Sequence, residues 1–184
     1  MGPTVTTTNI VLLDQDLVGR IPQAELANSQ VVIVNHASDP FTQIDQALYM
    51  RTGIETLRII SHGEAGALIL GGQVVNEEYL KTRTEEVASW GRSLVLGADI
   101  LLYGCSVAST ANGQSFVNEL SRITGADVAA STNITGFQGD TQLEYAHGDI
   151  QSHFLASHSS WQNAGISLLL PNQRIGSGAI WNGG

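Results

Sequence analysis

The chain has 184 residues, of which 42% are hydrophobic and 14% charged, which suits one domain with a sizeable core and excludes wholesale disorder. The formal net charge is −9 and there is no run of lysine or arginine, which argues against nucleic acid or an anionic membrane as a partner. No apolar run approaches the roughly 18 residues that a membrane span needs. The Thr-rich start, residues 1–9, lacks the features of a cleavable signal peptide, and localisation is left open.

Short apolar runs that end in turn residues recur along the chain. They predict strands over Ile10–Leu13, Val31–Val34, Leu57–Ile60, Ile100–Tyr103 and Val128–Ala130. Near-continuous apolar runs of this length indicate strands that are covered on both faces, as in a parallel sheet.

Segments with apolar residues at helical spacing lie between these runs. They predict helices over Thr42–Met50, Asn76–Leu94 and Gly113–Thr124. A hairpin is predicted over Gly66–Val75 and a last short strand over Gln142–Tyr145. Strands that alternate with helices predict a doubly wound α/β domain, with a mostly parallel sheet and helices on both of its faces.

The regular pattern stops near Ile150. We therefore divide the chain into an α/β domain over residues 1–150 and an irregular C-terminal tail over residues 151–184. The tail either wraps around the domain, leads to a further region, or is a processing segment.

Two predicted strands end in reactive residue types. His62 follows the run that begins at Leu57, and Cys105 follows the run that begins at Ile100. Consecutive strands of such folds are often neighbours, and functional groups gather beyond their carboxyl ends. Cys105 is the one cysteine of the chain, so it cannot form an intramolecular disulfide.

A thiol and an imidazole at this place predict nucleophilic catalysis. A thiol with a pKa near ~8.5 is mostly protonated at neutral pH, and an imidazole can take its proton and later donate it to a leaving amine. The backbone N–H groups of Gly63 and Cys105 are the predicted oxyanion donors.

The two strand ends, Ser61-His62-Gly63 and Tyr103-Gly104-Cys105, resemble those of the caspase/gingipain/clostripain group of cysteine peptidases. An ordered set of further motifs resembles the DUF4347 family over about Ile10 to Ile150. The set comprises Leu70-Gly71, Leu101-Leu102, Gly113, Phe116, Leu120, Thr124-Gly125-Ala126-Asp127-Val128-Ala129-Ala130-Ser131-Thr132, Thr135-Gly136 and Leu143-Glu144. The resemblance implies a caspase-like fold and thiol-protease activity, in domains often found near the start of very large bacterial surface or adhesin-like proteins.

The same resemblance implies a substrate pocket. In caspase-like folds the region of Ser131, Thr132 and Asn133 forms part of the pocket for the residue before the scissile bond. Asp140 either supplies charge there or is an ordinary loop carboxylate. The acidic residue that metacaspase-like relatives have two positions before the cysteine is Tyr103 here, so no preference for arginine or lysine is carried over. Thr141 replaces an aromatic residue that is usual in the DUF4347 family.

Simpler interpretations remain for the individual residues. His62 can be an ordinary turn histidine and Cys105 a small core residue. His36 and His147 are weaker candidates for the base, and Asp14 either lines the cleft or caps the next turn. His153 and His158 lie in the tail. The spacing of His147, His153 and His158 near Asp149 matches no zinc motif, so we predict no metal site.

Three functional hypotheses follow. The first is a hydrolase, a cysteine endopeptidase that acts on a peptide or protein, including its own polypeptide within a larger secreted or surface protein. The tail then is cut or occupies the cleft. The second is a catalytically silent module for adhesion, secretion or assembly. The third is hydrolysis or transfer on another acyl substrate with the same two residues. No cofactor is expected; related processing domains and adhesins use calcium, but the chain has no EF-hand or nonapeptide repeat.

Overall fold

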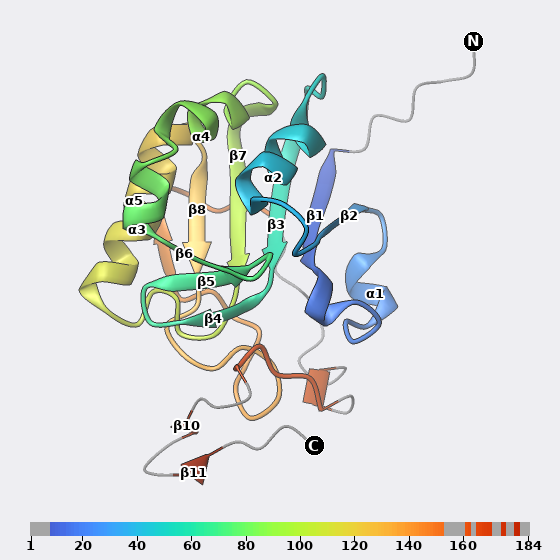
Figure 1. Ribbon diagram of the computed structural model, residues 1–184, viewed down its shortest axis with the longest axis vertical. Helices are drawn as coiled ribbons and strands as arrows, with labels where there is room; N and C mark the ends of the chain where they lie inside the picture. Colours follow the sequence, from blue (N-terminus) through green and yellow to red (C-terminus); the bar gives the residue numbers. More distant parts are fainter. Residues whose placement is uncertain (1–7, 153–160, 163–164, 171–173, 176–178, 181–184) are drawn as a thin grey trace.

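The computed structural model describes residues 8–152, 161–162, 165–170, 174–175 and 179–180, and a six-stranded sheet forms their centre (Figure 1). The strand order is β2-β1-β3-β7-β8-β9. The bounds are β1 Asn9–Asp14, β2 Gln30–Val34, β3 Ile54–Ile60, β7 Leu94–Tyr103, β8 Asp127–Ala130 and β9 Tyr145–His147. All pairings are parallel except the one between β8 and β9. The predicted α/β class with a mostly parallel sheet is confirmed.

Strand β3 lies between β1 and β7, so the adjacency predicted for the histidine and cysteine strands is confirmed. Leu57 pairs with Ile100, and Ile60 pairs with Tyr103. The chain runs outward from β1 to β2 and then crosses back over β1 to β3, so the strand order reverses between β1 and β3. The carboxyl ends of strands at such a reversal are the usual place for a binding site in an open α/β sheet.

Four helices cover one face of the sheet. They are α2 Pro40–Leu48, α3 Glu77–Lys81, α4 Thr84–Trp90 and α5 Ala111–Thr124. Their apolar residues, including Phe41, Trp90 and Phe116, form one buried cluster with alternate residues of the central strands. The helix predicted over Asn76–Leu94 is therefore two short helices, and Leu94 already belongs to β7.

Within the described ranges the second face carries only short helical segments, so the helical cover expected on both faces is much smaller on this one. Among the described residues it is covered by the 3-10 helix η1 Gln15–Leu17, the four-residue α1 Gln23–Leu26, the helical residue Trp161, and loop residues that include Leu168. Right-handed crossovers explain this asymmetry, because only the connection from β1 to β2 runs in the direction that places it on this face.

Two strand predictions also need correction. Val31 and Ile33 are 37% and 41% exposed, because β2 is an edge strand whose outer residues on one face lack a covering helix. The last strand lies at Tyr145–His147 rather than Gln142–Tyr145, since Leu143 turns into the second cluster instead of pairing with β8.

A small antiparallel sheet projects from the carboxyl ends of the central strands (Figure 1). It consists of β4 His62–Glu64, β5 Ala67–Leu70 and β6 Gln73–Asn76. Gly71 and Gly72 join β5 to β6 with φ values of 57° and 76°, which suit glycine, so the predicted hairpin is confirmed. A separate pair, β10 Arg174–Ile175 and β11 Ala179–Ile180, lies near the end of the chain.

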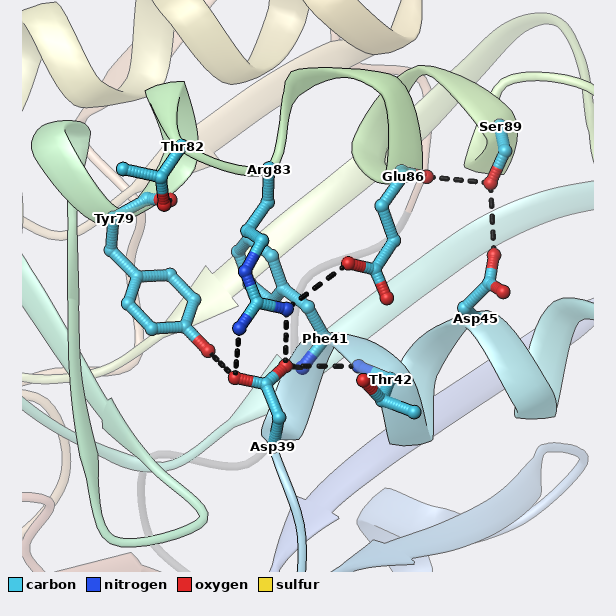
Figure 2. Close-up of polar contacts among 9 residues, drawn as sticks. All are labelled: Asp39, Phe41, Thr42, Asp45, Tyr79, Thr82, Arg83, Glu86 and Ser89. Atoms are coloured by element: carbon cyan, nitrogen blue, oxygen red, sulfur yellow. Dashed lines mark hydrogen bonds and ion pairs between the residues drawn. The ribbon is translucent and has the colours of Figure 1, made fainter.

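Figure 2 shows a polar network that joins α2 to α3 and α4. The Asp39 carboxylate caps α2 by accepting hydrogen bonds from the N–H groups of Phe41 and Thr42, at 3.0 and 3.1 Å. It also accepts hydrogen bonds from the Tyr79 hydroxyl and the Arg83 guanidinium. Burial raises the pKa of Asp39, but these hydrogen bonds and the Arg83 charge outweigh it and hold the pKa below its usual range.

Replacing Asp39 with alanine should lower the free energy of unfolding by about 2 kcal/mol, because both the helix cap and the link to α3 and α4 are lost. The contribution of the carboxylate is present at neutral pH and is lost as the pH falls through the lowered pKa. Urea unfolding at pH 7 measures the change. Asp39→Asn keeps a capping oxygen and should lose less; an Asp39→Ala chain as stable as the wild type contradicts the assignment.

Candidate functional site

The turns that follow β3 and β7 are in direct backbone contact. The Ser61 N–H donates to the Tyr103 carbonyl at 3.0 Å, which continues the strand pairing beyond the end of β3. A Cβ atom placed on Gly63 lies 2.7 Å from both the Cys105 nitrogen and the Gly104 carbonyl carbon. Real side chains do not tolerate such distances, so only glycine lets the His62 turn and the Cys105 turn come this close.

The Cys105 side chain is fully buried in the cluster on the second face of the sheet. Its sulfur accepts a hydrogen bond from the Thr135 N–H at 3.3 Å and lies 3.7 Å from the Thr135 carbonyl oxygen. Burial raises the pKa of the Cys105 thiol to about 11, although hydrogen bonds from the Thr135 backbone, the Ser167 side chain and the Leu168 backbone lower it. The thiol is therefore protonated at neutral pH in this arrangement.

His62 begins β4, and only 8% of its surface is exposed. Its Nδ1 atom lies 3.1 Å from the carbonyl oxygen of Leu168. The Gly63 N–H donates to the same oxygen at 3.3 Å. The predicted base and one predicted oxyanion donor therefore share one acceptor, a backbone carbonyl from the C-terminal part of the chain.

The loop after β8 borders the cysteine turn, where the sequence predicted a substrate pocket. Ser106 has a φ of 58°, a left-handed conformation that is strained for a residue with a side chain, and its N–H donates to the Asn133 carbonyl at 2.7 Å. Ser131 is buried and accepts a hydrogen bond from the Ala108 N–H. Asn133 is exposed and donates to the Asp140 carboxylate at 2.9 Å.

Thr132 is the remaining predicted pocket residue, and its N–H donates to the Glu144 carboxylate at 2.7 Å. The structure thus brings Ser131 and Asn133 against the cysteine turn, with Asp140 one hydrogen bond further out. Their role in substrate binding stays a prediction.

Thr135 is a site residue that the sequence reasoning missed. Besides its two contacts with the Cys105 sulfur, its hydroxyl donates to the Gly104 carbonyl at 3.3 Å. Its own carbonyl accepts the Leu168 N–H at 3.1 Å. The pair Thr135-Gly136 belongs to the family resemblance, but nothing in the local pattern distinguishes this threonine from an ordinary turn residue.

His147 and His36 do not lie at this junction. His147 ends β9 opposite Val128, toward the amino end of β8, and is exposed. His36 follows β2, and its Nε2 atom lies 3.4 Å from a carboxylate oxygen of Asp16. His153 and His158 lie outside the described residues.

Among the described residues, one group of possible metal ligands consists of Asp14, Asp16 and His36. The two oxygens of the buried Asp14 carboxylate accept hydrogen bonds from the N–H groups of Asp16 and Gly71, at 2.9 and 2.7 Å. Asp14 thus caps the turn that follows β1, one of its two predicted roles. Asp16 and His36 are exposed, and such exposed acidic groups are common without a metal. The expectation that no cofactor is needed stays a prediction.

A cavity of about 550 Å³ lies at the opposite end of the strands. It is lined by the amino-end residues Thr56 and Arg58 of β3 and by Asp99 of β7. One oxygen of the buried Asp99 carboxylate accepts the N–H groups of Gln151 and Ser152, at 3.0 and 2.6 Å. Neither His62 nor Cys105 lines this cavity.

The fold and the site define an α/β domain with a mostly parallel sheet, in which a histidine turn and a cysteine turn meet at the carboxyl edge. The model of the family described as a domain of unknown function, DUF4347, matches residues 10–165. The chain therefore belongs to the DUF4347 family, and the match extends beyond Ile150 into the region of Trp161. A search of curated proteins finds no match. No helix within the described ranges is long and apolar enough to cross a membrane.

Proposed function

We propose that this domain is a cysteine endopeptidase with a caspase-like arrangement, in which Cys105 is the nucleophile and His62 is the general base. The observation that carries the proposal is the backbone contact of Gly63 with the Gly104–Cys105 peptide. This contact fixes the imidazole-bearing and thiol-bearing turns beside each other at the carboxyl edge of the sheet, one strand pair away from the strand-order reversal between β1 and β3. Gly63 also directs its N–H toward a carbonyl oxygen, as an oxyanion donor must.

In the proposed reaction His62 takes the thiol proton, the sulfur attacks the scissile carbonyl, and the imidazole returns the proton to the leaving amine. The N–H groups of Gly63 and Cys105 stabilise the oxyanion. The wider proposal is that the domain processes its own polypeptide within a larger secreted or surface protein.

A catalytically silent module is the second candidate. It is favoured by the buried thiol, whose pKa near 11 and hydrogen bonds to Thr135 are those of an unreactive structural cysteine. The two candidates differ in what happens when the cleft is emptied, because only a catalytic thiol then becomes a fast nucleophile. An enzyme that acts only on a non-peptide acyl substrate would leave a peptide library uncut.

Hydrolysis of a peptide library made from a digested proteome, with the cut sites read by mass spectrometry, tests the proposal. We expect Cys105→Ala to lower the cleavage rate at least 1,000-fold and His62→Ala at least ~100-fold. The library is also given to Gly136→Ala, in which the new methyl group pushes Ile166 away. This variant shows activity that the chain's own residues 166–168 would otherwise block. Cleavage that survives Cys105→Ala, or no cleavage by either the wild type or Gly136→Ala, overturns the proposal.

A further inference from the structure

Residues 166–168 lie along the loop after β8 as an added antiparallel strand. The Leu168 N–H donates to the Thr135 carbonyl at 3.1 Å, and the Phe137 N–H donates to the Ile166 carbonyl. Gly136 and Ser167 form the antiparallel bridge between these two bonds. An extended peptide that adds to the edge of a domain through main-chain hydrogen bonds is a common way in which a peptide ligand is held.

This strand ends at the candidate catalytic groups. The Leu168 carbonyl oxygen lies 3.1 Å from His62 Nδ1 and 3.3 Å from the Gly63 nitrogen. The Ser167 side chain and the Leu168 backbone interact with the Cys105 thiol. One backbone carbonyl is therefore shared by the proposed base and the proposed oxyanion donor, in a segment that also contacts the proposed nucleophile.

The strand is apolar and fully covered. Leu168 is completely buried, and Ser167, Ile166 and Leu169 are 1%, 4% and 4% exposed. Leu168 belongs to the same buried cluster as Ile60, Tyr103 and Cys105. No described residue from 165 to 170 carries a charge, so the site that holds this strand is adapted to an uncharged, hydrophobic peptide.

Gly136 shows how closely the strand is fitted. A Cβ atom placed on Gly136 lies 2.3 Å from the Ile166 carbonyl oxygen and 3.0 Å from the Trp161 ring, and its φ is 97°. Gln162 adds hydrogen bonds from its side-chain amide to the carbonyls of Gly136 and Gly139, at 3.2 and 3.3 Å. The loop after β8 is thus shaped to receive this part of the chain.

From this register we infer that the cleft takes peptides with leucine before the scissile bond, and that the Leu168–Leu169 bond is the chain's own first substrate. The inference rests on the proposed peptidase function. The Cys105 sulfur forms a bond to the Leu168 carbonyl carbon while the bond to the Leu169 nitrogen breaks. The thiol proton passes through His62 to that nitrogen. Water then hydrolyses the thioester, which leaves a carboxylate on Leu168 and restores the thiol.

Intact-mass measurements on the full 184-residue chain during incubation at pH 8 test the inference. We expect the wild type to release a fragment that ends at Leu168. Cys105→Ala and Leu168→Asp should slow its release at least 100-fold, whereas Leu168→Met, which keeps an apolar side chain of similar volume, should stay within about tenfold. Thermal unfolding of each chain shows whether it is folded.

A second measurement does not depend on the variants. The wild-type chain is treated with two thiol-reactive peptide ketones, one with the sequence Ile-Ser-Leu and one with Ile-Ser-Asp. Labelling of Cys105 should be at least tenfold faster with the leucine probe, and equal rates contradict leucine preference.

The outcomes separate the inference from the proposed function. A Cys105-dependent cut at a different bond, or an uncut chain that still hydrolyses library peptides, overturns the inference and leaves the peptidase. An uncut chain with no library hydrolysis and no labelling by either probe overturns both. Release of the fragment from Cys105→Ala attributes the cut to another protease and also overturns the inference.

Discussion

Replacing Gly136 with alanine should speed the alkylation of Cys105 by iodoacetamide at pH 7.5 at least tenfold. The added methyl group meets the Ile166 carbonyl oxygen at 2.3 Å, which forces residues 166–168 away from the thiol. A thiol with a pKa near 11 is ionised about a hundredfold less at this pH than one with the ordinary value of 9.0. A thiolate of lower basicity is also a weaker nucleophile, which reduces the expected increase in alkylation rate to about tenfold. Easier access of the reagent to the sulfur raises the rate further.

The pH dependence of the alkylation rate reports independently on whether residues 166–168 have moved away from the thiol. In the wild type the alkylation rate should keep rising past pH 9 and level off only near pH 11, because the buried thiol ionises late. In Gly136→Ala it should level off closer to pH 9. Gly97→Ala is the matched control, since Gly97 has a similar positive φ of 77° but a Cβ there meets nothing within 4 Å. A folded Gly136→Ala chain with the wild-type rate contradicts the covering role of residues 166–168.

Gly63→Ala should destabilise the domain by about 3 kcal/mol, the upper part of the range for overpacking. The new methyl group would lie 2.7 Å from the Cys105 nitrogen and 2.8 Å from the Cys105 carbonyl oxygen. These are backbone atoms that follow a central strand, so neither can move without disturbing the pairing of β3 with β7. Thermal unfolding should show a melting temperature lower by about 6–12 °C.

The neighbouring glycine provides the control for Gly63. A Cβ on Gly104 meets the flexible end of Leu68 at 3.0 Å and other atoms only from 3.3 Å, so Gly104→Ala should cost about 1 kcal/mol. Equal stability of the two alanine variants would contradict the close contact between the His62–Gly63 turn and the Gly104–Cys105 turn.

The parts of the fold that follow from local patterns could be predicted from the sequence. Leu57–Ile60, interrupted by Arg58, and Ile100–Tyr103 are apolar runs of strand length. The preference of consecutive strands for adjacent places predicted that the turns after them lie side by side. The Gly71-Gly72 turn was likewise visible, because two glycines between apolar runs are typical of a hairpin.

The features that depend on distant contacts could not be predicted. The pairing of Ile166–Leu168 with Thr135–Phe137 joins irregular segments with no period of their own, so residues 166–169 looked like part of a structureless tail. The exposure of Val31 and Ile33 depends on β2 being an edge strand, which apolar composition alone does not reveal. The short β4 was missed because His62-Gly63-Glu64 has the composition of a turn.

The place of residues 166–169 in the chain has a consequence for the newly made protein. Every strand of the central sheet lies before residue 148, and so do the turns that carry the imidazole and the thiol. Chains are synthesised from the amino end, and their early parts begin to fold while later parts are still being made. A sheet that folds before residues 166–169 pair with the loop after β8 would leave the Cys105 thiol uncovered until that pairing forms.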